Sequence, residues 1–204
     1  NYQLHFVRCP LLRAGPVLRA LVALPGPAPP LLRPGFAAPG LAALDFAPPL
    51  KNGCRVSTDY PISAISSGLV VSSDKGETWI DLDEDGDIHT GWSLLYMHLA
   101  TEGRIEQGAR VETGDQLGFP SCEGGTSSAS HVHIARMYNG QWMSADRPIP
   151  FQIGDWVAEA RLNNVYKGYL LNQETEQRLE SSFAREPDKN IFPGDQPIPP
   201  TPEP

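Results

Sequence analysis

Three of the chain's five histidines lie in two short segments that both have the character of β-strands. The first segment is Tyr96-Met97-His98-Leu99, and the second contains His131-Val132-His133. Successive side chains of a strand point to opposite faces of a sheet, so His131 and His133 should point the same way. A Gly-rich stretch at 108–118 separates the two segments as a hairpin would. We therefore expect an antiparallel sheet that brings three imidazoles together.

Strand and turn signals continue on both sides of these segments. Tight turns are indicated at Asp74-Lys75-Gly76, Gly114-Asp115 and Asn139-Gly140. Residues rich in β-branched and aromatic side chains predict strands at 62–71, 78–82, 92–99, 109–111, 116–119, 131–138 and 141–143. Successive hairpins of this kind predict an all-β fold, an antiparallel β-sandwich with irregular N- and C-terminal tails.

The histidine cluster indicates a metal site. Neutral imidazoles on one sheet face can bind a metal ion and still leave one imidazole to move protons, as a hydrolytic zinc site requires. An isolated His-x-His pair is more often two half-exposed strand residues without a shared function. Here three of only five histidines fall in adjacent predicted strands, which favours the site.

The order and spacing of these segments resemble the lysostaphin-like zinc metallopeptidases of the LytM or staphylolysin type, built on the duplicated hybrid motif β-sandwich. The matching run comprises 92–99, 108–118, Gly124-Gly125 and 131–136. The similarity extends over about half of the chain. It implies a zinc endopeptidase that hydrolyses peptide crosslinks of peptidoglycan or glycine-rich peptides.

The resemblance also implies roles for individual residues. In the family the second histidine of the His-x-His pair is a zinc ligand, which is His133 here. Asp45, in Leu44-Asp45-Phe46-Ala47-Pro48, matches the family's ligand aspartate. His98 and His131 match the histidines that orient or deprotonate the zinc-bound water and stabilise the oxyanion. The predicted site therefore binds one Zn²⁺ through Asp45 and His133, and His98 and His131 are its catalytic residues.

The match fails at one ligand. The family has another ligand histidine several residues before the aspartate, but this chain has no histidine between His5 and His89, and Leu41 stands at the nearest spacing. A catalytic zinc ion normally has three protein ligands and an open position for water. The sequence therefore predicts peptidase ancestry with a metal site that is incomplete as written. The alternative is a degenerate, non-catalytic member that binds cell wall or regulates a partner hydrolase.

The N-terminal composition bears on the missing ligand. Residues 10–44 use only Pro, Leu, Arg, Ala, Gly, Val and Phe, and no acidic residue precedes Asp45. GC-rich codons translated out of frame give such a composition, and a genuine Pro/Ala-rich linker is the other interpretation. The expected organisation is a doubtful segment at 1–40 and a peptidase-like β domain at 41–150. The domain is followed by an accessory hairpin packed on it at 151–185 and by a Pro-rich disordered tail at 186–204.

Cysteine usage indicates the compartment. Cys54 and Cys122 lie far apart in sequence and lack the C-x-x-C spacing of structural zinc sites. We expect them to form a disulfide that pins the loop before His131, and therefore an extracytoplasmic protein, secreted or associated with the cell wall. Cys9 lies in the doubtful segment and is given no role.

Charge and hydropathy limit the partners. The net charge is −8, and the four arginines before Asp45 leave residues 45–204 with 12 basic and 24 acidic side chains. This balance argues against nucleic acid or an anionic membrane surface as a partner. The longest apolar stretch, 11–24, is interrupted by Arg13, Pro16 and Arg19, so no membrane span is expected. The predicted partner is a peptide or peptidoglycan substrate.

Two further motifs have other interpretations. Asp81-Leu82-Asp83-Glu84-Asp85-Gly86-Asp87 looks like the start of a calcium loop, but Trp92 stands where an EF-hand has its bidentate glutamate, and strands flank it. An acidic hairpin tip is the favoured interpretation, and a weak calcium site is the other. The hairpin 111–118 is also found in lipoyl and phosphocarrier sandwiches. No lysine lies between Lys75 and Lys167 to carry a lipoyl group, and a phosphocarrier would need a reduced, cytoplasmic chain.

Overall fold

The computed structural model describes residues 43–48, 53–56, 58–125, 127, 129–146, 148–161 and 164–180. Every regular element in this part of the chain is a β-strand, which confirms the predicted all-β, antiparallel class. The strands are β1 (Ala43–Phe46), β2 (Ile62–Ser63), β3 (Gly68–Asp74), β4 (Glu77–Asp81), β5 (Trp92–Met97), β6 (Arg110–Val111), β7 (Gln116–Gly118), β8 (Val132–Tyr138), β9 (Gln141–Trp142), β10 (Gln152–Ile153), β11 (Trp156–Arg161), β12 (Asn164–Asn172) and β13 (Arg178–Glu180). No helix long and apolar enough to cross a membrane occurs among these residues.

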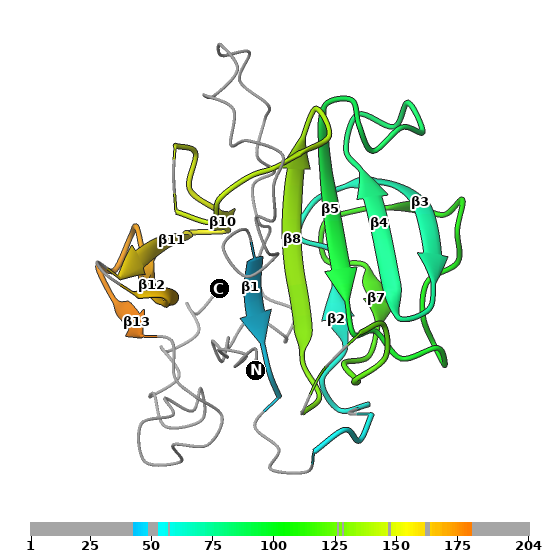
Figure 1. The fold of residues 1–204 in the computed structure, drawn as a ribbon, viewed down its shortest axis with the longest axis horizontal. Coiled ribbons are helices and arrows are strands. Elements are labelled where there is room, and N and C mark those ends of the chain that lie inside the picture. The colour runs from blue at the N-terminus through cyan, green and yellow to red at the C-terminus, as the bar shows by residue number, and fades with distance from the viewer. Residues whose placement is uncertain are drawn as a thin grey trace, which may run out of the picture.

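A seven-stranded antiparallel sheet forms the main layer (Figure 1). Its strand order is β1-β8-β5-β4-β3-β6, and β9 pairs with the C-terminal part of β8. In this register Asp45 of β1 lies opposite His133 of β8, and Met97 at the end of β5 lies opposite His133 on its other side. Residues far apart in sequence thus meet at one end of three adjacent strands.

The second layer is a two-stranded sheet of β2 and β7, which lies behind the main sheet in Figure 1. Ile62 and Leu117 from this small sheet are buried in one core with Val70, Ile80 and Tyr96 of the main sheet. The alternation of side chains places these main-sheet residues on one face and leaves the other face for the site. The Tyr96 hydroxyl accepts a hydrogen bond of 2.9 Å from the Ile65 N–H, which ties the layers together.

Two strand predictions were wrong in their pairing. The expected strand 62–71 is divided into β2 and β3, which belong to different sheets, because the chain bends between Ser63 and Gly68. The expected hairpin of 109–111 and 116–119 does not form either, because β6 pairs with β3 and β7 pairs with β2. The strands β6 and β7 therefore belong to two different sheets. Local turn signals do not determine this pairing.

A third sheet follows where the sequence predicts an accessory hairpin at 151–185. The described residues there form a four-stranded antiparallel sheet in the order β10-β11-β12-β13. Its buried residues belong to the same hydrophobic core as the main sheet, and they are Phe151, Ile153, Trp156, Ala158, Leu170 and Leu179. Apolar burial therefore continues from the main sheet into this one.

Candidate active site

Asp45, His131 and His133 converge at the paired ends of β1 and β8. Asp45 Oδ1 lies 2.8 Å from His133 Nδ1 and 3.8 Å from His131 Nε2. The three residues share one face because antiparallel pairing sets Asp45 against His133, and His131 precedes His133 by two positions. His131 is fully buried and His133 is 6% exposed. The sequence-based expectation that both imidazoles point the same way is therefore met.

His98 joins this cluster through an unusual backbone conformation. It follows the last residue of β5 and has a φ of +65°. In a regular strand it would point away from the face occupied by Met97. The left-handed conformation ends the strand and turns the imidazole toward the cluster, with its ring centroid 4.3 Å from His131 and 6.4 Å from His133. Non-glycine residues adopt this conformation at a cost of about 1 kcal/mol or more, and they concentrate at functional sites.

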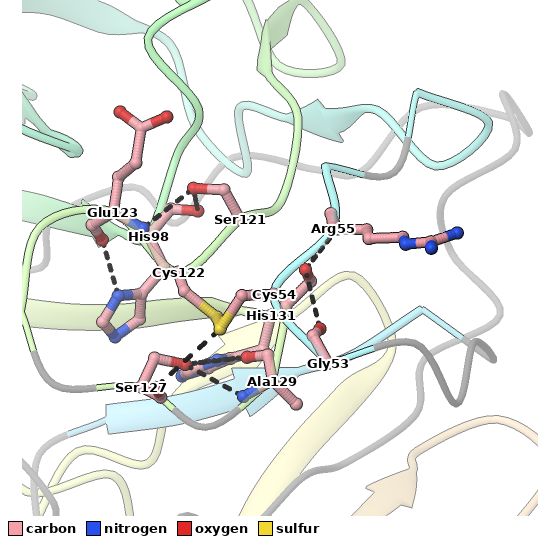
Figure 2. Close-up of a disulfide and its surroundings, with 11 residues drawn as sticks. Gly53, Cys54, Arg55, His98, Ser121, Cys122, Glu123, Ser127, Ala129 and His131 are labelled. Carbon is pink, nitrogen blue, oxygen red and sulfur yellow. Dashed lines mark hydrogen bonds between the residues drawn. A yellow bond between two sulfur atoms is a disulfide. The ribbon is translucent and has the colours of Figure 1, made fainter.

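The loop between Ser121 and Ser130 fixes the orientation of two imidazoles (Figure 2). His98 Nδ1–H donates to the Glu123 carbonyl at 2.7 Å. His131 Nδ1–H donates to the Ala129 carbonyl at 2.8 Å, with the Ser127 hydroxyl 3.2 Å from the same nitrogen. A proton held on Nδ1 leaves the Nε2 lone pair to act as a base or ligand in each neutral ring.

Burial also sets the charge of these imidazoles. Desolvation lowers the pKa of His131 to about 4, although the Asp45 carboxylate opposes the shift. Desolvation is also the largest cause that lowers the pKa of His98, and it exceeds the opposing hydrogen bond to Glu123. Both rings are therefore neutral near pH 7 and can accept a proton.

The predicted disulfide between Cys54 and Cys122 is present, with 5.3 Å between the two Cα atoms (Figure 2). Its neighbours bind the site segments directly. The Ser121 N–H donates to the His98 carbonyl at 2.7 Å, and the Ser130 N–H donates to the Gly53 carbonyl at 2.8 Å. The crosslink therefore closes the loop that orients His98 and His131.

The side chains of the cluster are of the chemical types that bind zinc. A carboxylate oxygen and an imidazole nitrogen are common zinc ligands, and two ligands about 2.1 Å from a tetrahedral zinc ion lie about 3.4 Å apart. Asp45 Oδ1 and His133 Nδ1, at 2.8 Å, need to separate only slightly to reach that spacing. Buried His133 Nε2 has no hydrogen-bond partner among the described residues.

The described residues of the cluster supply too few ligands for a catalytic zinc ion. Within the described part of the chain, only Asp81, Asp83 and Asp85 form a group of three or more possible ligand side chains with donor atoms within 4.8 Å of one another. The cluster therefore supplies Asp45 and His133 as two of the three protein ligands that a catalytic zinc site normally has. Leu41 and Cys9 lie outside the described residues.

His89 is not part of the cluster. Its Nδ1 lies 2.9 Å from Asp87 Oδ1, and 70% of its side chain is exposed, as expected from its place beside the acidic loop. It lies against Gly140, after the C-terminal end of β8, whereas His131 stands at the N-terminal end of that strand. It is therefore remote from Asp45 along the sheet.

Sequence reasoning missed the groups that orient the site. The carbonyls of Glu123 and Ala129 hold the imidazoles, but every residue has a carbonyl, so no sequence signal marks these two. It also missed Arg136, a buried cation that donates hydrogen bonds to the carbonyls of Ser144, Ile149 and Pro150. A single arginine in a strand gives no warning of such a role.

The sequence profile of peptidase family M23 matches residues 51–145. The deep-sea M23 metalloprotease pseudoalterin superposes with a TM-score of 0.55 at 20% identity, over 71% of this chain and 84% of that one, which shows a shared fold. The catalytic domain of the antimicrobial peptidase lysostaphin from Staphylococcus simulans is 26% identical over 50% of this chain and 72% of that one, with a TM-score of 0.36. A mutant catalytic domain of the prophage-encoded M23 protein EnpA from Enterococcus faecalis is 25% identical over 55% of this chain and 81% of that one, with a TM-score of 0.38.

No curated protein sequence matches the chain. The family profile spans Cys54, His98, His131 and His133, so it covers most of the cluster described above. The fold, the order of the motifs along the chain and the profile match agree. Residues 51–145 thus match peptidase family M23, the family of the lysostaphin-like metallopeptidases, and the fold agrees with that match.

Proposed function

We propose that this chain is built as a zinc metalloendopeptidase for peptide bonds in peptidoglycan crosslinks or glycine-rich peptides, with one zinc ligand missing from this copy. One observation carries the proposal. Asp45 Oδ1 lies 2.8 Å from His133 Nδ1 and 3.8 Å from His131 Nε2, and the His98 ring stands 4.3 Å from that of His131. Three buried imidazoles beside a partly buried carboxylate are costly to keep together unless they bind a metal ion or move protons.

Asp45 and His133 would hold the zinc ion, and His131 and His98 would handle protons. When bound, zinc polarises a scissile carbonyl and acidifies a water molecule. His131 keeps its proton on Nδ1 through the Ala129 carbonyl, so its Nε2 can accept a proton from the nucleophile. His98, held by Glu123, can donate a hydrogen bond from Nε2 to a developing oxyanion once protonated there.

The location and the substrate follow from the same proposal. A disulfide such as Cys54–Cys122 persists in an oxidising compartment, so we propose an extracytoplasmic, secreted or cell-wall-associated protein. Lysostaphin, a family relative, is an antimicrobial peptidase. Cell-wall peptide is the substrate class that the resemblance of the sequence motifs implies, and we propose it for this chain.

The missing ligand has a proposed origin in residues 1–40. The strand β1 begins at Ala43 and pairs normally with β8, so family-like structure is present from there onward. Leu41 stands four positions before Asp45, where the resemblance calls for a histidine. We propose that the preceding segment is translated out of frame. Resequencing the gene should reveal a shifted frame over about codons 1–40, and an intact frame through this region would overturn this part of the proposal.

A non-catalytic, degenerate member is the second candidate function. It is favoured by one observation, namely that the described residues supply only two zinc ligands. Such a protein would bind cell-wall peptide or regulate a partner hydrolase without cleaving a bond.

Metal analysis of the purified chain separates the two candidates. We expect less than one tightly bound zinc per chain in the protein as written, and one per chain in Leu41→His. Leu41→Asn, which alters the same position without adding an imidazole, is the matched control. Leu41→His should then clear a suspension of crosslinked peptidoglycan, and His133→Ala in the same background should lose both zinc and clearing. Zinc bound by Leu41→His without any hydrolysis would favour the non-catalytic candidate.

A further inference from the structure

The loop between β4 and β5 gathers three carboxylates at the end of the main sheet away from the histidine cluster. Asp81 is the last residue of β4, and Asp83 and Asp85 follow it. One carboxylate oxygen from each residue lies within 4.8 Å of one from each of the others. Among the described residues Arg110 pairs with Glu84, and no salt bridge neutralises the three aspartates. The three aspartates therefore have no cationic partner among the described residues, although Arg110 pairs with Glu84 of the same loop.

Asp81 distinguishes this loop from an ordinary acidic hairpin tip, because its side chain is buried. Its relative exposure is 0%, so its carboxyl has lost its water shell. Oδ2 accepts a hydrogen bond of 2.8 Å from the Gly86 N–H, but Oδ1 has no hydrogen-bond partner among the described residues. A buried carboxylate oxygen without a partner costs several kcal/mol in general, unless a cation compensates for it.

The pKa of Asp81 is that of a buried carboxyl whose charge is not compensated. Burial is the largest cause that raises its pKa, and the neighbouring carboxylates of Asp83 and Asp85 add to the effect, bringing the pKa to about 6. The folded protein thus disfavours the charged form of a group that it holds between two other acids. A bound divalent cation would reverse both effects.

The loop backbone is shaped to hold the carboxylates in place. Gly86 has a φ of +90° and Gly91 a φ of +56°, conformations that glycine adopts without strain. A Cβ atom at Gly91 would lie 2.2 Å from Asp83 Oδ2, so this glycine makes room for that carboxylate. Asp85 is fixed on both oxygens, by the Asp87 N–H at 2.8 Å and by the Thr90 hydroxyl at 2.5 Å.

We propose that Asp81, Asp83 and Asp85 bind one Ca²⁺ ion. An all-oxygen, carboxylate-rich donor set suits a hard cation and disfavours zinc, which prefers nitrogen and sulfur. Asp83 and Asp85 are exposed, so water can complete the six to eight oxygen ligands that calcium takes in a flexible geometry. The smaller Mg²⁺ demands a near-ideal octahedron of six ligands and loses its water molecules reluctantly, so it suits this loop less well. Trp92 replaces the bidentate glutamate of an EF-hand, so the affinity is that of a weak, extracellular type of site.

Calcium at this position would stabilise the β4–β5 hairpin. Asp81 pairs with Ser93, whereas Glu77 pairs with Met97 at the other end of the same two strands, next to His98. In Figure 1 the loop between β4 and β5 lies at the top of the main sheet, whereas β5 ends and β8 begins at the bottom. The proposal is therefore independent of zinc binding and of peptidase activity.

Titration calorimetry of the full chain, stripped with EDTA and dialysed into buffer, tests the proposal with CaCl₂ as the probe. We expect saturable binding of one Ca²⁺ per chain and an increase of several degrees in Tm at millimolar Ca²⁺. MgCl₂ at the same concentration should give a much smaller increase. The absence of both a saturable heat and a Tm increase with Ca²⁺ would overturn the proposal.

Single substitutions assign the ligands. Asp83→Asn and Asp85→Asn should each weaken Ca²⁺ binding about tenfold or more, because each removes a charged ligand. Asp74→Asn, at the tip of the β3–β4 hairpin, is the matched control and should bind Ca²⁺ as the original chain does. Equal loss in Asp74→Asn would show nonspecific binding to surface acids and overturn the assignment.

Asp81→Asn separates a ligand from a purely structural hydrogen-bond acceptor. Its side-chain oxygen can still accept the Gly86 N–H, while the buried charge is gone. In EDTA we expect this variant to melt at or above the temperature of the original chain, and in Ca²⁺ we expect it to gain no stability. A variant that melts below the original chain in EDTA and still responds to Ca²⁺ would contradict the proposal.

Discussion

At the scale of single residues, the site depends on how each imidazole is held. His98 leaves the regular strand geometry with a φ of +65°, and its Nδ1–H is held by the Glu123 carbonyl. His131 is held in the same way by Ala129. His133 instead faces a carboxylate oxygen of Asp45. The histidines therefore fall into two kinds, two oriented by backbone carbonyls and one paired with an acid, which is the division expected between proton carriers and a metal ligand.

This division predicts different effects of three alanine substitutions. In the Leu41→His background, His131→Ala and His98→Ala should each retain about one zinc per chain and lose roughly 10²- to 10⁴-fold in peptidoglycan hydrolysis, because general acid–base catalysis typically contributes that factor. His133→Ala should lose zinc as well. Metal analysis and turbidity clearing on the same samples check this, and loss of zinc in His131→Ala would instead make His131 a ligand.

At the scale of elements, a disulfide and the hydrogen bonds of a buried arginine hold the loops around the sheet. The Cys54–Cys122 disulfide joins positions 68 residues apart and ends beside the loop that orients His98 and His131. Arg136 of β8 donates to three carbonyls of the segment 144–150 and lies over the Phe151 ring, 4.8 Å from its centroid. The disulfide joins the loop before β2 to the loop between β7 and β8, and Arg136 joins β8 to the segment before β10.

Removing the disulfide should destabilise the fold. Closing a loop of this length lowers the entropy of the unfolded chain by an amount worth about 4 kcal/mol in the chain-entropy description. We expect the double variant Cys54→Ser, Cys122→Ser to lose stability of that order in urea denaturation. Reduction of the original chain should give the same loss, whereas a reductant should not affect the double variant.

Replacing Arg136 should also destabilise the fold, although lysine keeps the charge. Arg136 is 2% exposed, and its planar guanidinium reaches several carbonyls that an ammonium group cannot reach together. We expect Arg136→Lys to lower the free energy of unfolding by about 2 to 3 kcal/mol. Arg178→Lys, at an exposed arginine, is the control and should change it by less than about 1 kcal/mol. Equal effects of both substitutions would contradict the role of Arg136.

At the scale of the whole molecule, one hydrophobic core serves all three sheets. Phe46 of β1 and Leu117 of β7 belong to the same buried cluster as Trp156 and Leu170 of the C-terminal sheet. The family profile ends at residue 145, so this sheet lies beyond the part of the chain that the profile matches. Its burial indicates that it contributes to the stability of the region that the profile matches.

Truncation tests this contribution. A chain that stops after residue 150 would expose the apolar face that Phe151 and the C-terminal sheet cover. We expect it to bind a hydrophobic dye and to unfold at lower urea concentration, or to be insoluble. A chain that stops after residue 180 retains every described strand and should behave as the original does. Equal stability of the two truncated chains would contradict a shared core.

The fold class and the shared face of two histidines could be predicted from the sequence because the signals are local. The period of two in 131–138 places His131 and His133 on one face, and the turns at Gly76 and Gly140 predict the β3–β4 and β8–β9 hairpins. The pairing of β6 and β7 with separate partners could not be predicted, because register between distant strands depends on packing in the completed core.

The sequence by itself determined that strands dominate, that His131 and His133 share a face, and that acids gather between β4 and β5. These follow from side-chain alternation and from residues adjacent in the chain. Only the tertiary structure decided that Asp45 meets His133, that His98 turns toward both, and that Asp81 is buried while its neighbours stay exposed. Those outcomes depend on which strands pair and on what covers them, and contacts between distant residues are fixed only when the whole core forms.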